Sequence, residues 1–199
     1  VCGGHIGRAR RLATDPEARA QREKALSLAR AATRDSTAYA AAEDLVKSAE
    51  AAAKAIAAEL DEAETEEMRT ALGAGGTGKG TSRMPRGTAG ALKELEKRQK
   101  SRATRVGRDV LDRALVDLAA LFRDALVVSV GARVTPMHPD KSDDITIPMA
   151  GYARPEQLLQ CVEAVLDCRE ALDMNVKPKF AVDDMVARIG LALKRQVDA

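Results

Sequence analysis

Apolar residues recur every three or four positions along most of this chain, which is the spacing of one face of an α-helix. The clearest example lies in the second half of a segment from about 89 to 130, where apolar positions alternate four and three apart. They are Leu111, Leu115, Leu118, Phe122 and Ala125. Such a heptad-like seam predicts a long helix that packs closely against its neighbours.

The same periodicity predicts further helices over 15–31, 37–72, 154–175 and 179–196. The first of these has a strong start, because Asp15 can cap the helix and Pro16 suits its first turn. The second of these helices carries a narrow apolar stripe, formed by Leu45, Ala49, Ala52, Ile56 and Leu60. We expect the last two helices to bury their apolar residues, which are Leu158, Leu159, Val162, Val165, Leu166 and Leu172 on the first and Val182, Met185, Val186, Ile189 and Leu193 on the second.

Two segments interrupt this helical pattern. A glycine-rich linker is predicted near 73–88, and the prolines of 131–153 predict a long loop in which Ile145 to Ile147 form a short extended patch. The linker separates an acidic stretch at 59–67 from a basic stretch at 93–108. We therefore predict that the two long helices form an antiparallel hairpin with complementary charges.

Composition supports an all-α fold, since aromatic residues make up 2% of the chain and Trp is absent, and the periodicity predicts about five helices. The formal net charge of +2 predicts no strong overall field toward nucleic acid. Cys161 and Cys168 lie seven residues apart on one predicted helix, about 10 Å along its axis and too far for a disulfide. Free thiols fit a cytoplasmic location, and no apolar run is long enough to span a membrane.

Residues 73–81 match the pattern of a phosphate-binding loop, in which Lys79 would hold phosphates and Thr81 would bind magnesium. That loop needs a buried strand before it and a helix directly after it. Here an acidic helix is predicted before the motif, and Pro85 interrupts the chain soon after it. We therefore interpret these residues as a glycine-rich hairpin linker. The alternative, a nucleotide-binding enzyme that uses Lys79 and Thr81, is less favoured.

The basic stretch leaves two interpretations open. Lys97, Arg98, Lys100, Arg102 and Arg105 could contact nucleic-acid phosphates, as in a basic helical adaptor protein. They could also form a solvated face that pairs with the acidic end of the other long helix. We favour the second interpretation, because no aromatic residue is interleaved to stack on bases.

No other constellation predicts catalysis or metal binding. His5 and His138 are isolated in the sequence, and the cysteines lack the spacing of a metal site. Asp140, Asp143 and Asp144 resemble a weak cation-binding run, although a solvated loop explains them better. The sequence thus predicts no catalytic residue, no metal and no cofactor.

The first fourteen residues lack an initiator Met and combine glycines with Arg8, Arg10 and Arg11 on a short predicted helix. A domain rarely begins on a one-turn helix with no core of its own. We therefore expect residues 1–14 to be the remnant of a preceding domain, and 15–199 to be a helical C-terminal domain.

Three stretches together resemble the C-terminal part of the delta-prime subunit of the bacterial DNA polymerase III clamp loader, in its actinobacterial form. Residues 4–12 are similar to the lid helix that ends the AAA+ module, and Arg8 falls at its sensor-2 position. Residues 111–126 are similar to the long collar helix. Residues 168–182 are similar to the closing helix pair of the collar, whose first helix ends in an Asn and a short turn. The glycine-rich motif and residues 95–105 also resemble the actinobacterial form, so the likeness covers nearly the whole chain.

The resemblance implies a collar-type helical bundle whose function is oligomerisation. Clamp-loader subunits assemble through such collars into a pentameric ring, so the implied partners are the gamma/tau and delta subunits, with DNA reached only through the complex. Delta-prime does not itself hydrolyse ATP, which implies that this chain is not an enzyme by itself. We expect the principal interface to lie on the last two helices.

Overall fold

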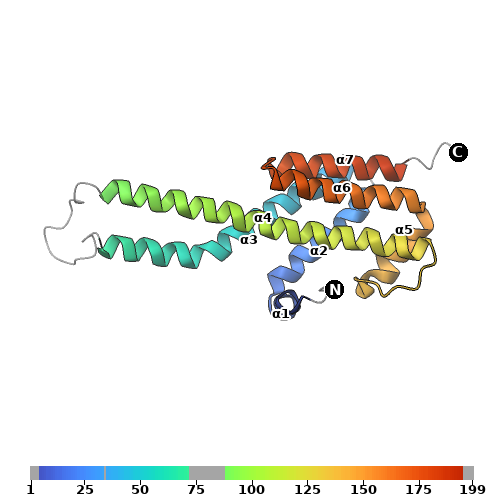
Figure 1. The fold of residues 1–199 in the computed structure, drawn as a ribbon, viewed down its shortest axis with the longest axis horizontal. Coiled ribbons are helices and arrows are strands. Elements are labelled where there is room, and N and C mark those ends of the chain that lie inside the picture. The colour runs from blue at the N-terminus through green and yellow to red at the C-terminus, as the bar shows by residue number, and fades with distance from the viewer. Residues whose placement is uncertain (1–4, 34, 72–87, 195–199) are drawn as a thin grey trace. The chain divides into compact units, whose positions relative to one another are not determined.

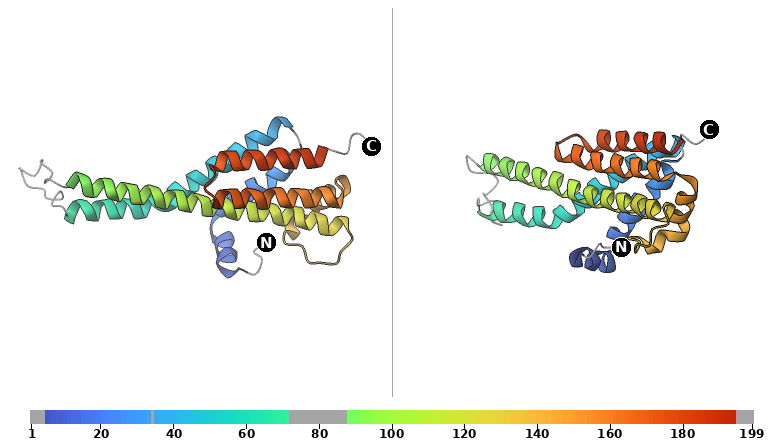
Figure 2. Two further views of the ribbon diagram at one scale, coloured as in Figure 1. Left: turned by 45° about the horizontal axis from the view of Figure 1, so that its top comes forward. Right: turned by 45° about the vertical axis from the view of Figure 1, so that its right-hand side comes forward.

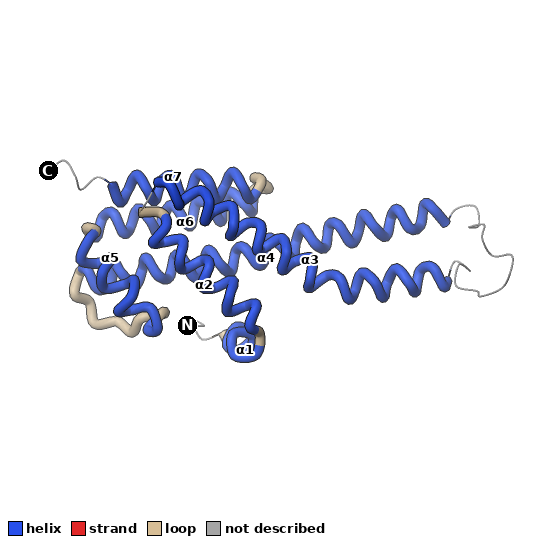
Figure 3. Tube along the Cα trace, turned by 180° about the vertical axis from the view of Figure 1, so that it is seen from behind, coloured by secondary structure: helices blue, strands red, loops and turns tan. Residues whose placement is uncertain are grey.

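The computed structural model describes residues 5–33, 35–71 and 88–194, and every regular element within them is helical (Figures 1 and 3). The prediction of an all-α fold is therefore confirmed. The α-helices are α1 (Ile6–Thr14), α2 (Pro16–Ala31), α3 (Asp35–Ala71), α4 (Thr88–Ser129), α5 (Ile147–Tyr152), α6 (Pro155–Asp173) and α7 (Pro178–Lys194). A 3-10 turn, η1 (Pro139–Lys141), and a π turn, η2 (Ser142–Thr146), precede α5.

The chain divides into two compact units. The first contains residues 1–48 and 111–199, and the second contains residues 49–110. The boundaries fall inside α3 and α4, so each of these long helices contributes one part to each unit.

The core of the first unit is built largely on the second half of α4. All members of the predicted seam are buried, and Leu115, Leu118, Phe122 and Ala125 have no exposed surface. The side chains of Leu26, Leu28, Leu158, Met185 and Ile189 are also fully buried in this unit. Helix α2 starts as predicted, because Asp15 accepts hydrogen bonds from the backbone N–H groups of Glu17 and Ala18 at 2.9 and 3.2 Å.

Helices α6 and α7 form an antiparallel pair that stays side by side in all views (Figures 1 and 2). Asn175 allows the reversal, because it takes a positive φ of 66° just after α6. The N–H of Val176 then bonds the carbonyl of Ala171 at 2.9 Å, as in a Schellman motif. At the other end, the buried Gln157 side chain donates to the carbonyl of Ala192 at 2.7 Å and ties the two helices together.

The inner face of α6 also carries both cysteines of this helix pair. Cys161 and Cys168 are free thiols with 0% and 4% exposure. Burial raises the pKa of each thiol to about 12. The prediction of unpaired cysteines on one helix is therefore confirmed.

The segment 131–153 is more ordered than the sequence predicts. Only its first part is a loop, and the expected extended patch at Ile145 to Ile147 is wrong, because these residues lie in the helical turns of η2 and α5. Ile145 and Met149 are both buried, four residues apart, as on one helix face. Pro148 is compatible with the first turn of α5, where no intrahelical N–H bond is required.

Two apolar residues that we expected to be buried, and two members of the predicted apolar stripe, are largely exposed. On α6, Leu159 and Leu166 are 47% and 45% exposed, whereas Leu158, Val165 and Leu172 are buried. On α3, Ile56 and Leu60 are 48% and 56% exposed, because the neighbouring alanines occupy the inner face instead.

The second unit is a hairpin made by the C-terminal part of α3 and the N-terminal part of α4, as predicted (Figure 1). Its inner face is built on small residues, with Ala49, Ala52, Ala53 and Ala57 buried on α3 and Leu95 buried on α4. Between the buried alanines and Leu95 the contacts are polar: Gln99 donates to the carbonyl of Asp61 at 3.0 Å and to the hydroxyl of Thr65 at 3.1 Å. Arg102 bonds both carboxylate oxygens of Glu64 at 2.8 and 2.6 Å, which lowers the pKa of Glu64.

Replacing Gly107 by Ala should stabilise this hairpin. A β-carbon at Gly107 would lie 3.6 Å from the β-carbon of Ala53, an ordinary van der Waals distance. Alanine is favoured over glycine inside a helix by about 0.5–1 kcal/mol, so the Gly107→Ala variant should gain about that amount in urea unfolding followed by circular dichroism. The reciprocal Ala103→Gly change, one turn earlier, should lose a similar amount. A loss of stability in Gly107→Ala would contradict the described packing.

Candidate functional site

The residues of the phosphate-loop match, Lys79 and Thr81, lie outside the described residues. The nearest described segments are α3, which ends at Ala71, and α4, which begins at Thr88. Both are helices, whereas a phosphate-binding loop follows a buried strand. The geometry on either side therefore lends no support to nucleotide binding.

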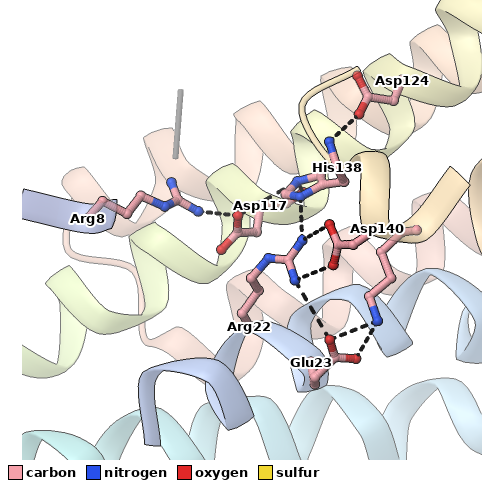
Figure 4. Close-up of polar contacts among 8 residues, drawn as sticks. Arg8, Arg22, Glu23, Asp117, Asp124, His138 and Asp140 are labelled. Atoms are coloured by element: carbon pink, nitrogen blue, oxygen red, sulfur yellow. Dashed lines mark hydrogen bonds and ion pairs between the residues drawn. The ribbon is translucent and has the colours of Figure 1, made fainter. Parts of the chain in front are cut away.

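Arg8, the residue at the sensor-2 position of the resemblance, lies on α1 and is directed at α4. Its guanidinium donates to the carboxylate of Asp117, and 19% of its side chain is exposed (Figure 4). Asp117 is 7% exposed, and burial raises its pKa, although the charges of Arg8 and Arg22 oppose that shift. In this structure Arg8 holds α1 against α4.

Asp117 belongs to a buried polar cluster that the sequence does not reveal. We call it the Arg22 cluster; its members are Arg22, Asp117, Asp124, His138 and Asp140 (Figure 4). Arg22, on α2, donates through Nη1 and Nη2 to the two carboxylate oxygens of Asp140, each at 2.9 Å. Its Nη2 also lies 2.8 Å from Nδ1 of His138. The cluster thus joins α2, α4 and the segment around η1.

The hydrogen bonds of His138 define its tautomer. Because a guanidinium can only donate, Nδ1 of His138 must accept from Arg22, so Nε2 carries the proton and donates to the carbonyl of Asp117 at 3.0 Å. Burial, with the nearby charge of Arg22, lowers the pKa of His138 from 6.5 to about 4. His138 is therefore neutral at pH 7.

Two further contacts hold the chain around His138 in place. The backbone N–H of His138 donates to Asp124 at 2.8 Å, and the other oxygen of Asp124 accepts from Arg123 at 2.8 Å. Lys141 and Glu23 form an ion pair at the edge of the cluster, at 2.8 Å (Figure 4). The hydrogen bonds and charge of Arg22 outweigh the burial of Asp140 and lower the pKa of its carboxylate.

The contacts of the Arg22 cluster hold α2, α4 and the segment around η1 together and leave His138 and Asp140 engaged with protein partners. The side chain of His138 is 1% exposed and both its nitrogens are engaged, so it is not placed to exchange protons with a substrate. Asp140, which the sequence suggested as part of a weak cation-binding run, is paired with Arg22. Within the described ranges, no group of three or more His, Cys, Asp or Glu side chains is arranged to hold a metal ion.

A second candidate is the outward surface of α6 and α7. Leu159 and Leu166 lie seven residues apart on one face of α6, and Val162 between them is half-buried. On α7, Phe180 and Leu191 are 59% and 67% exposed. We call these four large residues, Leu159, Leu166, Phe180 and Leu191, the outer apolar residues. They are the kind of side chain that a partner protein would cover.

The candidate nucleic-acid residues on α4 separate into two groups. Arg102 is half-buried and faces α3, where it pairs with Glu64. Lys97, Arg98, Lys100 and Arg105 are exposed. Among these five residues in the described ranges, Arg102 alone forms ion pairs across the hairpin, with Asp61 and Glu64, while the charge of Arg98 helps Arg102 to lower the pKa of Glu64.

In the part of the chain that the structure describes, every helix is too short or too polar to cross a lipid bilayer. In comparisons with known proteins, the chain matches no family model, no curated protein and no solved structure.

Proposed function

We propose that this chain is the C-terminal oligomerisation domain, or collar, of a delta-prime-type subunit of the bacterial DNA polymerase III clamp loader. It contributes to sliding-clamp loading in DNA replication by holding its subunit in the ring formed with gamma/tau and delta. In this role the chain works in the cytoplasm, has no catalytic activity or cofactor of its own, and is brought to DNA as part of the complex.

The observation that carries the proposal is the exposure of the outer apolar residues. Helix α6 has more large apolar residues than its inner face can bury, since Leu158, Val165 and Leu172 already fill that face. Leaving Leu159 and Leu166 in water costs hydrophobic free energy that burial against a partner would recover. Charged residues lie beside them, including the ion pair of Arg188 with Asp167 at 2.7 Å, as expected for the polar rim of an interface.

The local structure of the resembling stretches also supports this function. Residues 5–12 lie at α1, residues 111–126 lie within α4, and residues 168–182 span the end of α6, its turn and the start of α7. In the delta-prime resemblance the first helix of the closing pair ends in an Asn. Asn175 occupies that place here and supplies the positive φ that the turn requires.

The double variant Leu159→Asp/Leu166→Asp should lose its affinity for purified gamma/tau. Each leucine is about half exposed, so burying the remainder is worth about 1 kcal/mol, and charges would also have to be desolvated. We expect the wild-type chain to co-elute with gamma/tau in size-exclusion chromatography with light scattering, and the variant to bind at least tenfold more weakly.

The matched control is Ile56→Asp/Leu60→Asp, which introduces the same charges at residues of similar exposure in the other unit. It should bind gamma/tau like the wild type, and circular dichroism should show unchanged helix content in both variants. A wild-type chain that ignores gamma/tau and delta at micromolar concentrations would refute the proposed function. Equal losses in the two variants would refute the assignment of the interface to α6.

A further inference from the structure

The outward side of the hairpin unit carries a concentrated positive charge. Between residues 93 and 108, α4 has seven basic residues and two acidic ones, Glu94 and Glu96. The basic residues are Lys93, Lys97, Arg98, Lys100, Arg102, Arg105 and Arg108. Most of this charge is not needed to hold the hairpin together.

The contacts of α4 separate the structural residues from the remaining ones. The side that faces α3 contains buried Leu95, together with Gln99 and Arg102, which bond Asp61, Glu64 and Thr65. Lys93, Lys97, Arg98, Lys100 and Arg105 are all exposed, and none of them forms an ion pair with another residue in the described ranges. We call these five residues the basic face.

The basic face has a regular geometry. Lys93, Lys97 and Lys100 lie four and three residues apart, so they form one row along the helix, about 10 Å long. Arg98 and Arg105 lie seven residues apart and form a second row on the same outer half of α4. One strand of B-DNA presents a phosphate about every 3.4 Å of helix axis, so the first row matches the length of about three phosphate intervals.

We propose that the basic face of α4 binds the phosphate backbone of double-stranded nucleic acid, without reading its sequence. Long Lys and Arg side chains supply the charge-assisted hydrogen bonds that phosphates accept. Residues 49–110 include no Phe, Tyr, Trp or His, so the hairpin has no platform for stacked bases and favours a duplex over a single strand. This site lies in a different unit from α6 and α7 and does not depend on the proposed function.

The proposal is tested by fluorescence anisotropy with the full chain and a labelled 30-base-pair DNA duplex of arbitrary sequence. Contacts to three to five phosphates predict that affinity falls roughly 40- to 500-fold between 50 and 200 mM salt. The variant Lys93→Gln/Lys97→Gln/Lys100→Gln should bind at least tenfold more weakly at 50 mM salt and show a shallower salt dependence. A single strand of the same length should bind more weakly than the duplex.

The matched control removes the same charge elsewhere, as Arg10→Gln/Lys54→Gln/Arg133→Gln, three exposed basic residues outside the basic face. It should retain most of the duplex affinity and the wild-type salt dependence. Absence of wild-type binding at 50 mM salt, or equal losses in the two triple variants, would overturn the proposal. The proposal would also be overturned if light scattering showed that the basic face holds two copies of the chain together, and if the triple lysine variant bound DNA as tightly as the wild type.

Discussion

Replacing Arg22 by Met should lower the free energy of unfolding by about 3 kcal/mol. The change leaves Nδ1 of His138 without a donor at a position where 1% of the histidine side chain is exposed. It also removes both hydrogen bonds to Asp140, whose side chain is 42% exposed and therefore regains only part of its hydration. An unsatisfied buried polar atom costs about 1–3 kcal/mol, and loss of one partner of a buried ion pair costs about 3–5 kcal/mol. Because Asp140 is partly exposed and regains some hydration, we expect a total loss of about 3 kcal/mol, less than the sum of these two costs.

Arg30→Met is the matched control for this measurement. Arg30 lies on the same helix and donates a hydrogen bond to the carbonyl of Asp144 at 2.7 Å, but it is exposed. Its replacement should cost less than 1 kcal/mol. The loss of stability in Arg22→Lys should lie between those of Arg22→Met and Arg30→Met, because an ammonium keeps the charge but cannot reproduce the forked contacts to two partners. Urea unfolding monitored by circular dichroism gives all three values, and equal losses for Arg22→Met and Arg30→Met would contradict the role of the cluster.

Acidification should destabilise the protein through His138. Its pKa is about 4 in the folded chain, against an ordinary value of 6.5, so the unfolded chain binds the proton more tightly. The stability that neutral His138 contributes is therefore fully present above pH 6.5 and is lost as the pH falls toward 4. The shift corresponds to about 3 kcal/mol over this range.

Other titratable groups around His138 also change the stability as the pH falls, and their effects must be distinguished from that of His138. Asp117 acts in the opposite direction, because its raised pKa favours proton uptake by the folded chain as the pH falls. Asp140 has a lowered pKa and loses stability in the same direction as His138, while Asp124 and Arg22 also face the imidazole. The informative quantity is thus the difference between the wild type and His138→Gln, which cannot gain a proton. That difference should be constant above about pH 6.5 and shrink toward pH 4; a difference independent of pH would refute the lowered pKa of His138.

Helix positions were predictable from the sequence where periodicity and end signals agreed. The start of α2 at Pro16 depends on Asp15 and Pro16, which act locally, and the buried seam of α4 follows from spacing alone. The sequence was less informative about which apolar residues stay outside. Ile56 and Leu159 fit a helical stripe as well as their buried neighbours do, and only the packing of adjacent helices decides between them.

The Arg22 cluster was beyond sequence reasoning because its partners are distant along the chain. Arg22 and His138 are 116 residues apart, and His138 appeared as an isolated histidine in a loop with no neighbours of matching chemistry. The same distance problem hid the role of Arg8, which lies 109 residues from Asp117. In the hairpin, by contrast, the sequence correctly predicted two antiparallel helices, but of the five basic residues proposed to pair with the acidic stretch only Arg102 forms ion pairs across it. Which of the basic residues makes the contact depended on the helix face that each one occupies.

The two buried thiols of α6 provide a natural reporter of how often the first unit opens. Alkylating reagents attack the thiolate, and at pH 8 a thiol with a pKa of about 12 is ionised in roughly one molecule in 10,000. Cys161 and Cys168 are also shielded from reagent, so their modification would proceed through molecules in which α6 has separated from its neighbours. The rate at which peptides containing these cysteines gain mass in a mass spectrometer would therefore measure an opening equilibrium. A partner that covers the outer apolar residues of α6 would slow that reaction, and its affinity could be read from the native chain without any attached label.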